Sequence, residues 1–457
     1  MRHGGAELFL AVAALLATYA RMAAALFLSI FIAYALGFAM YRNKVAESVL
    51  LPVLDVLQSV PILGFFPVAL YVFIHYVPHV GAELAAVFLI TTSMLWNLIF
   101  GVYQALKTAP RELLDMATAY LDEKLKFIHV LLPSTLPSLY YNAAVSWANA
   151  FFFITASEVI TLGTETRLFG IGSLVVSAFE KGRYDLAYVG IAVGLVGNLL
   201  IYATLWRWVT KKLPELPAPN LLYYWSKWGS YVVYTASALA AAIFIQYLSA
   251  SITSTHVFLG GLAESSLSAA PSLLRVVAVL TVCIVAGVVA AWLVVERPSI
   301  ERGVLLVVAA FSSTPPAFLF PLLAKYIRGE LLAVLLPVPA SVVYTVFNAL
   351  AAWRSVPRDM AKAYHITGAT YLIHVLIPAS LPFLVTGTLT AWGGAWNGLV
   401  VAEPLAEVNG IGTYMAAAAD KGNMNKLIAS VVVMTAIVVL VNRLVWKKLY
   451  EKAAQWV

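Results

Sequence analysis

Apolar runs of about twenty residues recur along the chain, and no other feature limits its fold as strongly. A helix needs about 20 apolar residues to cross the hydrocarbon core of a membrane. Hydrophobic residues fill 62% of the 457 positions, and only 11% are Asp, Glu, Lys or Arg, against about 25% in a soluble domain. We therefore predict an all-α membrane protein with about 11 transmembrane helices, near 16–41, 52–74, 84–105, 133–157, 185–206, 229–249, 273–295, 303–325, 331–352, 378–401 and 428–446.

The basic residues indicate orientation in a membrane rather than nucleic-acid binding. The formal charge is +7, and most Lys and Arg lie beside the ends of apolar runs, as the positive-inside rule describes. If the loops at 106–132 and 353–377 are cytoplasmic, 19 of the 29 Lys and Arg fall on the inner side. The amino terminus is then expected outside the cell, as the start of a first span that is retained rather than cleaved. The carboxyl terminus is expected in the cytoplasm. The single cysteine, Cys283, allows no disulfide within the chain.

The sequence repeats itself at nearly constant separations. DMATAY at 115–120 returns as DMAKAY at 359–364, and HVLLPSTLP at 129–137 returns as HVLIPASLP at 374–382. The separation is 254 residues upstream of these blocks, 244 or 245 in and just after them, and 240 for the FGIG and NGIG segments at 169–172 and 409–412. Constant separations within blocks indicate two related five-span halves with insertions between them.

An odd number of spans in each half constrains how the halves are joined. Two directly joined five-span halves face opposite ways across the membrane, and the additional run at 229–249 restores a common orientation. We therefore predict parallel repeats with the transport pathway at their interface. The predicted domains are 1–213, a linker with the extra helix at 214–265, and 266–457.

The duplicated loop resembles the EAA loop of ATP-binding-cassette (ABC) importer permeases. The family pattern is E-A-A, three residues, Gly, nine residues and I-x-L-P. SVPILGFFP at 59–67 and the Gly-Ile-Gly segments resemble the nitrate, sulfonate and taurine branch. In the first copy the matching residues are Asp115, Met116, Ala117, Leu132 and Pro133. In the second copy they are Asp359, Met360, Ala361, Gly368, Ile377 and Pro378, where Gly368 follows shortly after the position at which the pattern has its glycine.

This resemblance implies a type I ABC importer permease, in which a short surface helix docks in a groove of an ATPase. An ordinary amphipathic loop between spans is the alternative. The chain has no G-x-x-x-x-G-K-[ST] motif, so ATP and Mg²⁺ are expected on a partner, and no cofactor or metal on this chain. The expected partners are two ATPase copies, an extracellular or periplasmic solute-binding protein and the lipid of the plasma membrane, with no nucleic acid.

The expected function is passage of a small anion such as nitrate, sulfonate, taurine or bicarbonate through a transport subunit that is not itself an enzyme. An ion-coupled secondary transporter with parallel repeats is the alternative, and a membrane enzyme is a weaker one because no His, Asp or Glu pairs cluster at the membrane surface.

Several repeated residues are candidates for the pathway. Pro61, Pro67, Pro315 and Pro321 interrupt the second span of each half, which is typical either of a cavity lining or of a simple kink. Polar-tipped side chains deep in the fourth spans line the pathway or pack between helices: Trp147, Asn149, Trp392, Trp396 and Asn397.

Charged residues near the predicted outer side form a second group of candidates. Glu158 and Glu403 are expected at a gate, or paired with Lys181, Arg183 or Lys421. Arg21 and Arg275 occupy equivalent places, and an intramembrane charge is a functional candidate. They either attract an anion to an outer vestibule or extend to the membrane surface.

Overall fold

The computed structural model describes residues 2–161, 167–206, 208, 220–312, 314–355 and 364–454, and all regular structure in these ranges is helical. The chain forms two compact units: residues 1–58 with 69–252, and residues 59–68 with 253–457. The short segment 59–68 therefore packs with the second half of the chain, although it comes from the first. The predicted domain boundaries after 213 and 265 stay a prediction.

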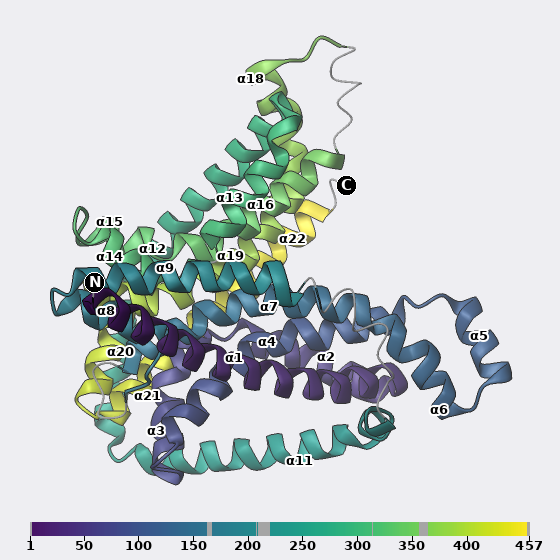
Figure 1. Cartoon of the computed structure of the whole chain (residues 1–457), viewed down its shortest axis with the longest axis horizontal. Coiled ribbons are helices and arrows are strands. Elements are labelled where there is room, and N and C mark those ends of the chain that lie inside the picture. The colour runs from purple at the N-terminus through teal and green to yellow at the C-terminus, as the bar shows by residue number, and fades with distance from the viewer. Residues whose placement is uncertain are drawn as a thin grey trace. The chain divides into compact units, whose positions relative to one another are not determined.

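The helices of the first repeat and the long linker helix lie in the first unit, apart from their residues 59–68 (Figure 1). They are α1 (Arg2–Arg42), α2 (Lys44–Ser59), α3 (Ile62–Tyr76), α4 (Gly81–Lys107), α5 (Arg111–Tyr120), α6 (Glu123–Lys126), the π-helix η1 (Phe127–Leu131), α7 (Leu132–Ile160), α8 (Ile171–Glu180), α9 (Tyr184–Ile201), the π-helix η3 (Tyr202–Trp206) and α11 (Asn220–Ser251).

The second unit contains the remaining helices. They are α12 (Thr255–Glu296), the 3₁₀ helix η5 (Pro298–Ile300), α13 (Glu301–Ser312), α14 (Pro316–Leu323), α15 (Glu330–Leu335), α16 (Val338–Ser355), α18 (Gly368–Tyr371), the π-helix η6 (Leu372–Leu376), α19 (Ile377–Leu405), α20 (Ile411–Asp420), α21 (Met424–Val441), the π-helix η7 (Asn442–Trp446) and α22 (Lys447–Ala454).

Equivalent helices pack in the same way within each unit. In the first, α1 contacts α4, α7, α8 and α9, while α4 packs on α7 and α8 on α9. In the second, α12 contacts α16, α19, α20 and α21, while α16 packs on α19 and α20 on α21. Two separate stretches of sequence therefore make the same set of helix contacts, and the parallel orientation of the repeats stays a prediction.

Seven described helices are long and apolar enough to cross a membrane, and a bent pair over 368–376 and 381–405 makes an eighth. They correspond to eight of the predicted runs. The runs at 52–74, 303–325 and 331–352 are each divided between two shorter helices, so the count of about 11 stays a prediction. Pro61 and Pro315 lie at two of the divisions, because proline lacks the N–H that would continue the helical ladder.

The division at Pro61 has a consequence within the second unit. The backbone N–H of Leu63 has no partner from the preceding turn, and it donates instead to Oδ1 of Asn397 on α19 (2.9 Å). Asn397 in turn donates through Nδ2 to the Gly393 carbonyl (2.9 Å). Gly64 packs against Met434 of α21 so closely that a Cβ would overlap the methionine side chain. Segment 59–68 is thus held in place by α19 and α21.

A π-helical turn precedes the spans that follow the duplicated loops. η1 ends just before Leu132-Pro133, and η6 ends just before Ile377-Pro378. A proline ring collides with the carbonyl four residues earlier in an α-helix. Widening that turn to the i→i+5 pattern relieves the collision. The same local sequence therefore gives the same irregular helix start in both halves.

Candidate functional site

A buried ionic cluster lies in the first unit where α1, α4, α7 and α8 meet. Arg21 of α1 binds Glu83 of α4 with two parallel hydrogen bonds, one of them 2.7 Å from Nη2 to Oε1. Its Nη1 donates to Oε1 of Glu158 at the end of α7 (3.0 Å). Arg21 is 7% exposed and Glu158 is fully buried. We call Thr18, Arg21, Glu83, Glu158 and Gly172 the first cluster.

The other two members, Gly172 and Thr18, connect Glu158 to the start of α8. The Gly172 N–H, in the first turn of α8, donates to Glu158 Oε2 (2.8 Å). Thr18 Oγ1 donates to Glu158 Oε1 (2.7 Å) and accepts from the Ile171 N–H (3.0 Å). The amino end of a helix attracts negative charge. Glu158 therefore ties α7, α1 and the start of α8 together.

The second unit repeats this arrangement with equivalent residues. Arg275 binds Glu330 of α15 through Nε and Nη2, both at 2.7 Å, and donates from Nη1 to Glu403 Oε1 (2.7 Å). Arg275 is 5% exposed and Glu403 is fully buried. We call Ser272, Arg275, Glu330, Glu403 and Gly412 the second cluster.

The second cluster also anchors a short helix. Glu403 accepts from Ser272 Oγ (2.6 Å) and, at the start of α20, from the Gly412 N–H (2.8 Å), while Ser272 Oγ accepts from the Ile411 N–H (2.9 Å). The hydrogen bonds from the Arg275 guanidinium hold the pKa of the exposed Glu330 carboxyl below its usual value, because they stabilise its charged form.

The clusters explain the glycines of the repeated Gly-Ile-Gly segments. A Cβ on Gly170 would lie 2.0 Å from Glu158 Oε1, and one on Gly410 would lie 2.2 Å from Glu403 Oε2. The backbone is extended at both positions, so close approach to the carboxylate, not a left-handed conformation, excludes a side chain.

The arginines and glutamates therefore behave differently from the expectation. Arg21 and Arg275 are not free positive charges, because each is buried and bound by two carboxylates. The partners expected for Glu158 and Glu403 were wrong as well. Packing of α1 on α7 and of α12 on α19 pairs them with Arg21 and Arg275 instead, while Arg183 pairs with Glu7 (3.6 Å).

Four side chains of the clusters were absent from the sequence-based candidates: Thr18, Glu83, Ser272 and Glu330. Thr18 and Ser272 share the separation of 254 residues that relates Arg21 to Arg275. Applying that separation to every polar residue of the first spans would have found them. Glu83 and Glu330 are 247 apart, which fits none of the repeated blocks.

The first coupling loop, residues 111–131, holds its small residue inward. Ala117 is 5% exposed, whereas the large side chains of α5 that face away from it, Leu113, Met116 and Tyr120, are 44%, 62% and 84% exposed. Residues three and four apart share one face of a helix. Ala117 therefore packs against its own chain, and its place at an ATPase contact stays a prediction.

The other residues of the loops have mixed environments. Asp115 and Pro133 are exposed, and Leu132 is buried. In the second coupling loop, residues 355–376, Asp359, Met360 and Ala361 lie outside the described residues. Gly368 adopts a left-handed conformation (φ 58°), as does His365 at the family's glycine position (φ 57°). Ile377 and Pro378 begin α19.

The pathway candidates are mostly buried. Pro61, Pro67, Pro315 and Pro321 are all buried, and Asn149 is half-buried. Trp147 packs against Tyr19 with ring centroids 5.8 Å apart. Trp392 and Trp396 lie together, 5.8 Å apart, and their indole N–H groups have no hydrogen-bond acceptor among the described residues. The roles of these residues in a pathway stay predictions.

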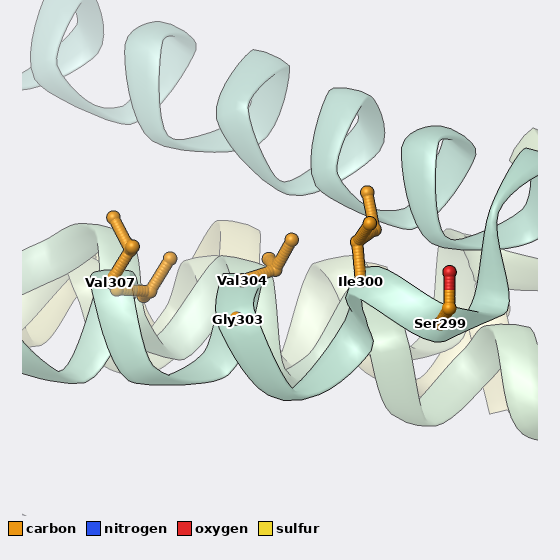
Figure 2. Close-up of a pocket in the computed structure, with 6 residues that line it drawn as sticks. Ser299, Ile300, Gly303, Val304 and Val307 are labelled. Atoms are coloured by element: carbon orange, nitrogen blue, oxygen red, sulfur yellow. The ribbon is translucent and has the colours of Figure 1, made fainter.

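A shallow hollow of about 460 Å³ lies along η5 and α13. Figure 2 shows Ser299, Ile300, Val304 and Val307 in a row along one helical stretch. The residues that line the hollow carry no charge and include none of the candidate site residues, so it contributes nothing to the recognition of a charged solute.

Comparison with known proteins places this architecture in a family. Residues 25–213 and 283–445 match the family described as binding-protein-dependent transport system inner membrane component. Because these two segments make up more than half of the chain, the protein belongs to this family of ABC importer permeases. The match in two segments agrees with an internal duplication. The family description and the several apolar helices define a multi-pass membrane protein.

Individual relatives belong to the anion branch. The nitrate import permease protein NrtB of Leptolyngbya laminosa is 29% identical over 168 residues, covering 36% of this chain and 56% of the relative. The bicarbonate transport system permease protein CmpB of Synechococcus elongatus is 23% identical over 202 residues, covering 43% and 69%. The taurine transport system permease protein TauC of Escherichia coli is 27% identical over 192 residues, covering 41% and 69%. The chain spans little more than half of the nitrate permease.

Replacing Glu403 by Gln is expected to destabilise the protein by about 3 kcal/mol, because removing one partner leaves the buried charge of Arg275 poorly compensated. Glu330→Gln is the matched control. It removes a carboxylate from the same arginine, but its side chain is 69% exposed, so the expected cost is about 1 kcal/mol or less. Thermal unfolding in detergent measures both, and equal losses would contradict a buried ionic cluster.

Gly410→Ala is expected to lower stability by about 1–3 kcal/mol, because the new methyl group collides with the Glu403 carboxylate. Gly393→Ala, on α19 of the same unit, is the control, since a Cβ there meets nothing within 4 Å. It should be neutral or slightly stabilising. The same unfolding assay applies, and a neutral Gly410→Ala would contradict the proposed reason for this glycine.

Proposed function

We propose that this chain forms the translocation pathway of an ATP-driven importer for a small anion delivered by a solute-binding protein. The observation that carries the proposal is the presence of two copies of the coupling loop in a family of binding-protein-dependent permeases. Relatives named for nitrate, bicarbonate and taurine transport support an anionic or zwitterionic solute of low mass. The substrate, and the residues that contact it, remain part of the proposal.

The proposed partner arrangement follows from the duplication. Each half supplies one loop, so one permease chain binds two copies of an ATPase subunit, and ATP and Mg²⁺ are bound by those subunits. In this proposal the repeats are parallel, and both loops and the carboxyl terminus lie on the cytoplasmic side. Two repeats of five spans with one linker span between them, eleven spans in all, give both loops the same side of the membrane.

The ionic clusters favour this mechanism over an ion-coupled secondary transporter. Coupling to a proton or a sodium ion requires a carboxylate inside the membrane that is free to bind the cation. The two fully buried carboxylates of the described chain, Glu158 and Glu403, are each held by an arginine, a hydroxyl and a backbone N–H. Each carboxylate is thus already engaged in contacts that hold helices together, which supports energy input from a partner.

Native mass spectrometry of the purified complex is expected to give one permease chain with two ATPase subunits. The chain alone is expected to have no ATPase activity. A complex with two permease chains for each pair of ATPase subunits would contradict the idea that one polypeptide supplies both docking loops.

The exposed face of α5 gives a second test of ATPase docking. Tyr120 and its repeat equivalent Tyr364 are 84% and 74% exposed, so Asp at either position should fold normally but place a charge in the proposed contact. Each single variant is expected to reduce co-purification of the ATPase about tenfold or more, as loss of an interface anchor of about 1.4 kcal/mol or more does. The double variant should abolish it.

Tyr326→Asp is the matched control, since this tyrosine is 79% exposed and lies between α14 and α15, on the side predicted to face outward. It should leave co-purification unchanged. Retention of the ATPase by the Tyr120 and Tyr364 double variant would count against the coupling-loop assignment.

A further inference from the structure

The beginning of the linker helix α11 is fastened to the first coupling loop. Tyr223 Oη and Lys227 Nζ both donate to Oε2 of Glu123 on α6, each at 3.3 Å. The Tyr223 ring packs edge-on against Phe127 of η1, with centroids 5.7 Å apart. Phe127 is fully buried, and Tyr223 is 8% exposed. A charged contact and an aromatic contact therefore join the same two segments.

The end of α1 supports both of these segments. Phe38 packs against Phe127 (5.1 Å between centroids), so α1 touches the loop directly. Arg42 donates to the Ser226 carbonyl (3.2 Å), and Trp225 Nε1 donates to the Phe31 carbonyl (2.7 Å). Figure 1 shows α5 and α6 projecting from the end of the first unit where α1 ends and α11 begins. The loop is thus held between two long helices.

The second repeat carries different residues at the equivalent positions. The separation of 245 residues places Gly368 opposite Glu123 and Leu372 opposite Phe127, and the separation of 254 places Glu296 opposite Arg42. These three positions of the second repeat therefore carry no carboxylate, aromatic ring or cation that matches the first. In the part of the chain that the structure describes, the fastening is therefore found at the first coupling loop.

We propose that α11 is a clamp that fixes the first coupling loop to α1 before the ATPase docks, which makes the two loops mechanically unequal. This inference rests on the proposed function, in which each loop receives one ATPase subunit. A loop that is already held in place loses less conformational freedom on docking. The first loop then moves with α1 and α11 as one body. The second loop lacks an equivalent attachment through Gly368, Leu372 and Glu296.

Amide hydrogen exchange over residues 111–126 in the full-length permease, without ATPase, tests the clamp itself. Glu123→Lys places a third cation beside Lys227 and Arg42. It should speed exchange of the loop about two- to fivefold, the range that corresponds to loss of a partly exposed ion pair. The exchanged pair Glu123→Lys with Lys227→Glu should return toward the parent rate. An unchanged rate in the single variant, or no recovery in the double variant, would overturn the clamp.

A matched control comes from the second unit, where Lys426 binds Glu264 at 2.6 Å with similar exposure. Glu264→Lys should leave exchange over 111–126 unchanged, and an equal increase would mean that the loop responds to any change of charge. If Glu123→Lys fails to insert, Tyr223→Phe removes only the hydroxyl. It should still raise the exchange rate, and a parent-like rate in that variant would count against the clamp.

Titration of the solubilised permease with its ATPase subunit tests the consequence for docking. Glu123→Lys should weaken binding by the same two- to fivefold, with recovery in the exchanged pair. Parent-like affinity together with faster exchange would overturn the role of the clamp in docking. Absence of ATPase binding to the parent chain would instead contradict the proposed function, and the exchange result would still decide whether α11 holds the loop.

Discussion

The pairing of a buried arginine with a buried glutamate organises each half of this permease. An ionised carboxylate in an apolar helix bundle is costly unless its charge is paired and both of its oxygens accept hydrogen bonds. Glu158 and Glu403 meet this condition by receiving an arginine, a hydroxyl and the N–H of a helix start. Each therefore links three helices, in addition to other polar contacts between them such as the hydrogen bond of Tyr34 on α1 with Thr135 on α7 (3.0 Å).

This constraint extends to the neighbouring sequence. The carboxylate occupies the space next to Gly170 or Gly410, so the segment that leads into α8 or α20 can carry no side chain there. The arginine reaches the start of α4 or α15 through Glu83 or Glu330. One ion pair in each half thus determines where four helices meet. Its duplication explains why two stretches with modest sequence identity build the same arrangement.

Much of this structure was accessible from the sequence, because apolar length and repeated motifs are local properties. Eight of the predicted runs appear as long helices or a bent pair, and equivalent helices pack alike. The three divided runs show the limit of hydropathy, which does not register the break that Pro61 introduces. The packing of segment 59–68 on α19 and α21 could not be predicted either, because it joins parts of the chain that are distant in sequence.

The ion pairs were not predicted, although all four residues had been singled out. Arg21 and Glu158 are 137 residues apart, and only the packing of α1 on α7 makes them neighbours. The inward position of Ala117 was missed for a similar reason: the motif places alanine in the loop but does not say which face of α5 it occupies. The contacts of α11 with Glu123 and Phe127 have no counterpart in the repeat and so left no signal in it.

A double-mutant cycle between Arg275 and Glu403 tests the central claim most directly. Arg275→Met, Glu403→Gln and the combined variant are compared with the parent by reversible unfolding in detergent. If the pair acts as one buried unit, the account predicts a coupling free energy of about 1–3 kcal/mol, with the double variant losing less stability than the sum of the single losses. Additive losses would show that the two residues stabilise the protein independently and would contradict the account.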